Sequence, residues 1–120
     1  MPNQKQKFGQ WGEEMAAQYL ISKDYEIVGR NIRNEFGELD LIVKKDDQLV
    51  FVEVKARRSE NFGFPEEAVT ESKRKHILEA AQSFMSDNLQ LVVDWRIDVI
   101  SIQALQGKSP EIIHFENAFG

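Results

Sequence analysis

Two acidic residues and one lysine stand in two aliphatic runs that a short polar turn separates. Asp40 belongs to the first run, and Glu53 and Lys55 belong to the second. Because side chains alternate between the faces of a β-strand, Glu53 and Lys55 share one face. If Asp46-Asp47 is a two-residue hairpin loop, Asp40 lies directly across from Glu53. Like charges directly opposite each other destabilise a sheet, so this pattern predicts a divalent cation between the two carboxylates.

The three residues would then serve as two ligands and one positioning cation in phosphodiester hydrolysis. Mg²⁺ or Mn²⁺ takes oxygen ligands, which makes Asp40 and Glu53 candidate metal ligands as well as candidate catalytic residues. Lys55 would orient the attacking water and offset the charge that develops in the transition state. The same pattern has a simpler interpretation, a salt-bridged sheet surface in which Glu38 pairs across the hairpin with Lys55 and no metal binds.

Two amphipathic helices are predicted beside these strands. Residues 8–22 carry an apolar stripe at helical spacing, and Glu13 lies at the edge of that stripe, where it can face a cleft between helix and sheet. The alternative for Glu13 is an ordinary first-turn acid that the helix dipole stabilises. Residues 71–86 form the second helix, with Thr70 as its N-cap. Lys73, on its core-facing side, either reaches the carboxylates or covers apolar surface. The buried stripe of this helix is expected to contain Ile77, Leu78, Ala81, Phe84 and Met85.

Further strands are predicted at residues 25–33, 91–102 and 111–116. The hairpin makes its two strands antiparallel, whereas a connection of roughly 30 residues through the second helix suits a parallel strand. The sequence therefore predicts an α/β fold, a mixed sheet flanked by helices, in one domain over residues 1–120. The loop at 59–65 is a natural place for substrate contact. Candidate substrate-contacting residues are Lys73, Arg57 and Arg58.

Composition narrows the function classes. The chain has 120 residues, a net charge of -5 and no cysteine, which excludes disulfides, thiolate zinc sites and cysteine nucleophiles and fits a cytoplasmic protein. No stretch is apolar enough to suggest a membrane span. Although the chain is acidic, eight of its fifteen lysines and arginines fall between Lys44 and Lys75, around the carboxylates. His76 and His114 are isolated in the sequence, and both are expected to be structural.

Short motifs follow one another along almost the whole chain. They are Gly9-x-x-Gly12-Glu13, Arg30-Asn31-x-Arg33, Gly37-Glu38-Leu39-Asp40-Leu41-Ile42, Phe51-Val52-Glu53-Val54-Lys55, Pro65-x-x-Ala68-Val69-x-x-x-Lys73 and Arg96-Ile97-Asp98-Val99. With these motifs the chain resembles the YraN family of predicted nucleases. Those bacterial proteins have the restriction-endonuclease-like PD-(D/E)xK fold and are akin to archaeal Holliday junction resolvases.

The resemblance implies a fold, a site and a substrate class. It implies an αβββαβ core, metal ligands at Asp40 and Glu53, a catalytic lysine at Lys55, and Glu13 as the helix glutamate that completes the metal site. It also implies a Mg²⁺- or Mn²⁺-dependent nuclease acting on DNA, with branched or structured DNA as candidate substrates, and a homodimer by analogy with junction-resolving relatives. Because the chain is acidic overall, the alternative is a non-catalytic nucleic-acid-binding or protein-interaction module that retains the fold.

Overall fold

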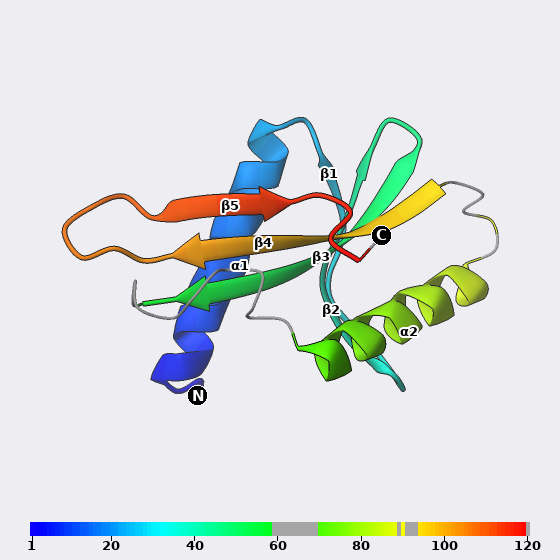
Figure 1. Ribbon diagram of the computed structural model, residues 1–120, viewed down its shortest axis with the longest axis horizontal. Helices are drawn as coiled ribbons and strands as arrows, with labels where there is room; N and C mark the ends of the chain where they lie inside the picture. Colours follow the sequence, from blue (N-terminus) through cyan, green and yellow to red (C-terminus); the bar gives the residue numbers. More distant parts are fainter. Residues whose placement is uncertain (59–69, 89, 91–93, 120) are drawn as a thin grey trace.

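The computed structural model is an α/β fold in which a five-stranded mixed sheet carries a helix on each face (Figure 1). It describes residues 1–58, 70–88, 90 and 94–119. In chain order the elements are α1 (Gln4–Ser22), β1 (Glu26–Asn34), β2 (Gly37–Lys45), β3 (Gln48–Arg57), α2 (Glu71–Asp87), β4 (Asp94–Gln103) and β5 (Glu111–Phe115). The predicted α/β class is confirmed, and the arrangement is compatible with a restriction-endonuclease-like core. The loop expected at 59–65 lies outside the described residues, as do residues 91–93 of the strand predicted at 91–102.

The strands lie in the order β1-β2-β3-β4-β5. Among the described strands, β3 and β4 run parallel, and each other neighbouring pair runs antiparallel. The chain between β3 and β4 contains α2, as a parallel connection requires. The central strands β3 and β4 are the most deeply buried of the sheet, so a charged side chain on either of them needs a partner.

The β2–β3 hairpin has the two-residue loop that the sequence predicts. Lys45 pairs with Gln48, and the register continues to Leu41 opposite Val52. The first loop residue, Asp46, has a φ of 54°, a left-handed conformation that tight hairpin loops use. Asp40 therefore lies one step beyond the last pair, next to Glu53.

Capping residues set the beginnings of both helices. Asn3 and Gln6 form a capping box, which places the start of α1 at Gln4 rather than at residue 8 as predicted. The side chain of Thr70 accepts a hydrogen bond from the backbone N–H of Lys73 at 3.2 Å, as expected for the N-cap of α2. The prediction that Leu78 is buried is wrong, because its side chain is 39% exposed and Ala80 takes the core position.

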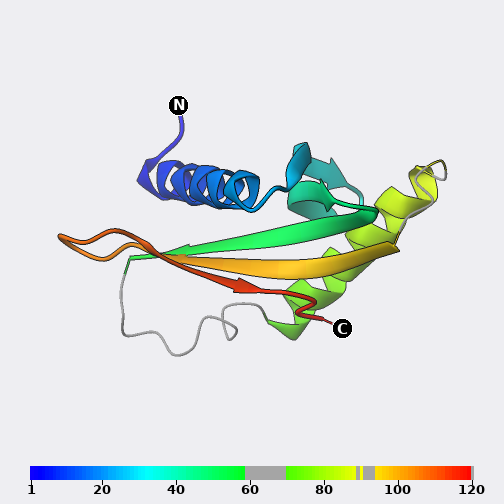
Figure 2. The same ribbon diagram turned by 90° about the horizontal axis from the view of Figure 1, so that it is seen from above.

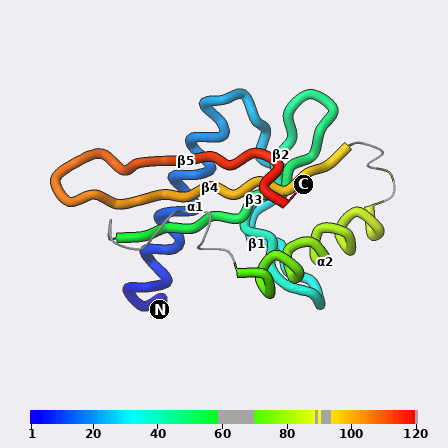
Figure 3. The backbone as a smooth tube through the Cα atoms, viewed as in Figure 1, coloured from blue at the N-terminus to red at the C-terminus, as the bar shows by residue number. Residues whose placement is uncertain are grey.

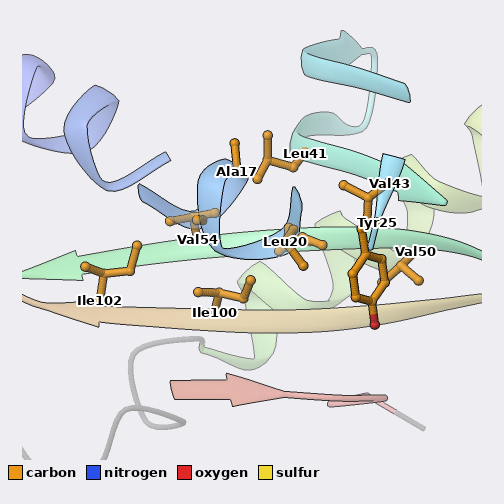
Figure 4. Close-up of a cluster of buried hydrophobic side chains, with 11 residues drawn as sticks. Ala17, Leu20, Tyr25, Leu41, Val43, Val50, Val54, Ile100 and Ile102 are labelled. Carbon is orange, nitrogen blue, oxygen red and sulfur yellow. The ribbon is translucent and has the colours of Figure 1, made fainter. Parts of the chain in front are cut away.

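α1 and α2 lie on opposite sides of the sheet (Figure 2), and each face of the sheet has its own hydrophobic core. Figure 4 shows Ala17 and Leu20 of α1 among side chains of β2, β3 and β4. On the opposite face, Ile77, Ala80 and Ala81 of α2 pack with Leu39, Ile42, Phe51 and other buried residues. α1 approaches β3 closely, since a Cβ built at Gly12 would lie 2.7 Å from the Cβ of Ala56. This approach fixes the height of α1, and of the adjacent Glu13, above the sheet.

The tip of the β1–β2 hairpin leaves β3 and extends beside α2 (Figure 3). The pairing of β2 with β3 ends at Leu41, whereas its pairing with β1 continues to Gly37. Asn34 near the tip donates a hydrogen bond to the carbonyl oxygen of Ala80 at 3.0 Å. Asp40 thus lies where β2 separates from β3. No helix among the described residues is long and apolar enough to cross a membrane.

Candidate active site

Three carboxylates from two elements meet where β2 separates from β3. Glu13 of α1 and Glu38 and Asp40 of β2 each contribute one oxygen, and these oxygens lie within 4.8 Å of one another. All three side chains are partly buried. Burial raises the pKa of Glu13, and the negative charges of Asp40 and Glu38 raise it further. Binding a proton or a cation would therefore stabilise this group of three carboxylates.

Asn31 of β1 connects two of these carboxylates. In the amide orientation that satisfies both neighbours, its nitrogen donates to Glu38 Oε1 at 3.1 Å and to Glu13 Oε1 at 3.2 Å. Its backbone has a φ of 50°, which is unusual inside a strand and tolerated best by glycine and asparagine. Arg33 of the same strand donates to Glu38 Oε2 at 2.7 Å. The predicted pairing of Glu38 with Lys55 is not what forms, because β2 has already left β3 at that point.

Asp40 and Glu53 form a second carboxyl pair beside the acidic group. Asp40 Oδ2 accepts a hydrogen bond from the backbone N–H of Val54 at 2.9 Å, and the side chains of Asp40 and Glu53 hydrogen-bond to each other. Burial raises the pKa of Asp40. Burial together with the charge of Asp40 raises the pKa of Glu53 to about 8. Glu53 is only 4% exposed, so at neutral pH it is the member that keeps the proton and donates it to Asp40.

Two lysines, Lys73 and Lys55, lie near Glu53. The Lys73 Nζ is 3.6 Å from Glu53 Oε1, so α2 does bring this lysine to the carboxylates. Lys55 is half-buried on β3, and its positive charge lowers the pKa of Glu53 without outweighing burial and Asp40. Arg57, the last residue of β3, is half-buried, and the next residue, Arg58, is exposed. The sequence thus placed Asp40, Glu53, Lys55 and Lys73 in one neighbourhood, and the structure adds Glu38 and Asn31 to it.

The acidic group borders an open hollow of about 450 Å³ between α1 and the β1–β2 hairpin. Its lining includes Gln6, Gln10, Glu13, Asn31 and Arg33. The donor set of this region consists of carboxylate oxygens, which suit Mg²⁺ or Mn²⁺ and offer no thiolate or imidazole for softer metals. Glu13, Glu38 and Asp40 therefore offer the oxygen ligands that a hard divalent cation prefers, and Glu53 lies beside them against Asp40.

A separate polar network on the α1 side of the sheet escaped the sequence prediction. Asp98 of β4 is fully buried and accepts hydrogen bonds from Arg96 at 2.9 Å and from the backbone N–H of Asn117 at 2.9 Å. His114 of β5 lies 2.7 Å from Asp98 through Nε2 and 3.1 Å from the hydroxyl of Tyr19 through Nδ1. His114, which looks isolated in the sequence, is therefore part of a polar network in the fold. Strand alternation places Asp98 on the same face as Arg96, but no local signal in the sequence shows that Asp98 is buried or names its other partners.

Comparisons with known proteins agree on one family. Residues 12–102 match the model of the family described as uncharacterised protein family UPF0102. A UPF0102 protein of Syntrophomonas wolfei is 49% identical over 113 residues, which cover 94% of this chain and 97% of the relative. A UPF0102 protein of Chloroherpeton thalassium is 44% identical over 119 residues, which cover 93% of this chain and 92% of the relative. One from Syntrophotalea carbinolica is 40% identical over 119 residues, covering 99% and 96%. The resemblance to the YraN family is therefore confirmed, since that family is UPF0102.

Proposed function

The chain belongs to the uncharacterised protein family UPF0102, and from this membership and the geometry of its carboxylates we propose that it is a metal-dependent nuclease hydrolysing phosphodiester bonds in DNA. The observation that carries the proposal is the meeting of Glu13, Glu38 and Asp40 within 4.8 Å, directly beside a buried Glu53. Arg33 pairs with Glu38, and Lys73 lies 3.6 Å from Glu53. The pKa of Glu13 and the pKa of Glu53 are nevertheless raised, by burial and by the neighbouring acids.

Each side chain has a role that its position supports. Glu13, Asp40 and Glu53 would hold the cation, and Asn31 would keep Glu13 and Glu38 in place. When bound, Mg²⁺ or Mn²⁺ offsets the negative charge of a phosphate group and acidifies a nearby water molecule. Lys55 orients the attacking water and stabilises the charge on the phosphate in the transition state.

Protonation of Glu53 links the site to pH. With a pKa of about 8, Glu53 holds a proton at neutral pH, and that proton must leave before the carboxylate can act as a ligand. Lys73 and Lys55 favour this ionisation, because their charges lower the pKa of Glu53. We therefore expect cleavage to increase as the pH rises from neutrality towards 8.

The test is incubation of the full chain with Mn²⁺ or Mg²⁺ and a panel of linear, nicked, tailed and four-way DNAs. We expect cleavage of at least one DNA, its loss in Asp40→Asn and in Lys55→Ala, and its retention in Asp94→Asn, an exposed acid on β4. Loss of one group that stabilises the transition state lowers such a rate by roughly 100- to 1,000-fold. Cleavage that persists in both site variants, or no cleavage of any DNA with either metal, would contradict the proposal.

A further inference from the structure

Three planar groups lie one on another where the first half of α1 meets the end of β3. The rings of Phe8 and Trp11 stack with centroids 5.3 Å apart and planes at 22°. On Phe8, the guanidinium carbon of Arg58 lies 4.1 Å from the ring centroid. We call Trp11, Phe8 and Arg58 the guanidinium stack. Trp11 packs against the core, Phe8 is half-buried and Arg58 is exposed, so the stack leads from the core to the solvent.

A shallow hollow of about 630 Å³ opens beside the stack, lined by Gln4, Lys5, Phe8, Ala56, Arg57 and Arg58. Every charged residue in this lining is basic, although the chain as a whole carries a net charge of -5. Aromatic and basic residues are thus concentrated at one place on an acidic protein. A cation over a single exposed ring is a common surface feature. The supporting second ring and the two flanking cations distinguish this one.

We propose that the guanidinium stack, with Lys5 and Arg57 beside it, binds an unpaired nucleotide of a DNA substrate. The inference rests on the proposed function and specifies its substrate class: DNA in which an unpaired strand leaves a duplex. The base lies on the guanidinium of Arg58, which Phe8 and Trp11 hold in place. Lys5 and Arg57 attract the adjoining phosphates. Guanidinium planes and aromatic rings stack unpaired bases with little regard to their identity.

The position of the stack agrees with this role. Arg58, the first residue after β3, follows Lys55 by three residues, a separation of about 10 Å for extended chain. Along α1, Phe8 precedes Glu13 by five residues, which is about 7.5 Å of helix. In Figure 2 the first half of α1 lies over the end of β3, and the contact of Gly12 with Ala56 fixes the two elements there. A nucleotide on the stack is therefore within a few nucleotides of the carboxylates.

The bases inside an intact duplex cannot stack on the guanidinium of Arg58, because both faces of each internal base are covered by its neighbours. Duplex binding would depend on phosphate contacts alone, whereas a single-stranded tail adds a stacking contribution. The proposal therefore separates two classes of DNA by affinity, whether or not the protein cuts either of them.

The experiment measures the affinity of the full chain in EDTA for a labelled blunt duplex and for the same duplex with a single-stranded tail. Phe8→Leu keeps an apolar side chain without a ring, and Arg58→Lys keeps the charge without a planar group. The control is Lys108→Ala, which removes an exposed lysine near the turn before β5. We expect the wild type to prefer the tailed DNA, and each stack variant to weaken tailed binding by roughly 5- to 150-fold while blunt binding is unchanged. Lys108→Ala should bind both DNAs like the wild type.

Equal affinity for tailed and blunt DNA, or a tail preference that survives in Arg58→Lys, would overturn the proposal. Because Arg58 is exposed, Arg58→Lys should fold normally, and it tests the guanidinium stack even if Phe8→Leu does not fold. Omitting the metal separates this inference from the nuclease proposal. If the protein binds tailed DNA preferentially but cuts no DNA in Mn²⁺, the guanidinium stack is supported as a binding site and the nuclease proposal is contradicted. If the protein cuts DNA but both stack variants bind tailed DNA like the wild type, the nuclease proposal is supported and the role of the guanidinium stack is contradicted.

Discussion

Buried charge controls the chemistry of individual residues in this protein. Glu53 lies beside Asp40 with almost no exposure to water, and two lysines do not fully compensate for this environment. Burying two carboxylates together is costly unless one is protonated or a cation joins them. The pair is thus poorly adapted for stability alone, which is common where side chains serve a reaction.

The pKa of Glu53 predicts how its removal changes stability. Because the folded-state pKa is about 8, against an ordinary value of 4.5, the folded protein holds a proton that the unfolded chain has lost between these values. The free energy of unfolding therefore falls as the pH rises through that window, by up to about 1.4 kcal/mol per pH unit. Glu53→Gln cannot ionise, so urea unfolding in EDTA should show it more stable than the wild type at pH 8 and nearly equal at pH 5. A difference that does not change with pH would contradict this prediction.

Asn31 should affect metal affinity without touching the metal. Both Asn31→Ala and Asn31→Gly remove the amide that joins Glu13 and Glu38, but glycine tolerates the left-handed backbone at this position and alanine does not. Loss of a residue that hydrogen-bonds to metal ligands typically changes metal affinity by about 10- to 100-fold. We expect Asn31→Gly to bind Mn²⁺ more weakly while keeping near-wild-type stability. Unchanged affinity in that variant would show that the amide does not organise the carboxylates.

Which site residues the sequence reveals depends on whether their spacing is local. Asp40, Glu53 and Lys55 were predictable because alternation and a two-residue loop fix which side chains are neighbours. Glu38 was assigned to Lys55 because the same register was extended past the point where β2 leaves β3. Asn31 carries no charge, and its left-handed backbone leaves no trace in hydrophobic pattern.

At the scale of elements, the contact between α1 and β3 positions the site. Gly12 lets the helix lie directly on Ala56, which sets the distance of Glu13 from Asp40 and Glu38. Helix ends were harder to predict than helix existence, because the capping box of Asn3 and Gln6 lies outside the apolar stripe from which the helix was inferred. The error at Leu78 arose because helical spacing placed it in the buried stripe, whereas Ala80 and Ala81 are the residues buried beside Ile77 and Leu78 is 39% exposed.

Substitution of Gly12 tests this contact. Gly12→Ala places a methyl group 2.7 Å from the Cβ of Ala56, and such overpacking costs about 1–3 kcal/mol. Gly9→Ala is the matched control, because nothing lies within 4 Å of its added methyl group and alanine favours the helix by about 1 kcal/mol. Thermal unfolding should therefore show loss of stability in the first variant and a small increase in the second. Adding Ala56→Gly to Gly12→Ala should restore part of the loss. Equal effects of the two glycine substitutions would contradict the close approach.

At the scale of the whole molecule, the Asp98 network joins segments that lie far apart in the sequence. Arg96 binds Asp98 and also donates to the hydroxyl of Tyr25 at 3.0 Å, while His114 connects Asp98 to Tyr19. The network thus connects α1, the residue before β1, β4 and β5 on one face of the sheet. Tyr19 and His114 are 95 positions apart in the chain, which is why single-sequence patterns could not show that they meet.

Loss of Asp98 should destabilise the fold rather than the reaction. Burial raises the pKa of Asp98, but hydrogen bonds from His114, Arg96 and Asn117 outweigh it and hold the pKa below its usual value. The stabilisation is therefore complete above the unfolded-state pKa near 4 and is lost as the pH falls through the folded-state value. At pH 7, Asp98→Asn should lower the free energy of unfolding by about 3–5 kcal/mol, and the difference should shrink below about pH 4. Asp94→Asn, exposed on the same strand, should have no such effect. A loss that is equally large in strong acid would contradict this origin.

Calorimetric titration with Mn²⁺ at pH 8 tests the central claim most directly, because it asks whether the carboxylates of α1, β2 and β3 form one metal site. We predict saturable binding by the wild type, weakened by about tenfold or more in Asp40→Asn. Glu14→Gln, in which the altered acid is an exposed neighbour of Glu13 on α1, should bind like the wild type. Absence of binding, or equal affinity in Asp40→Asn and the wild type, would contradict the account and leave a salt-bridged sheet surface in its place.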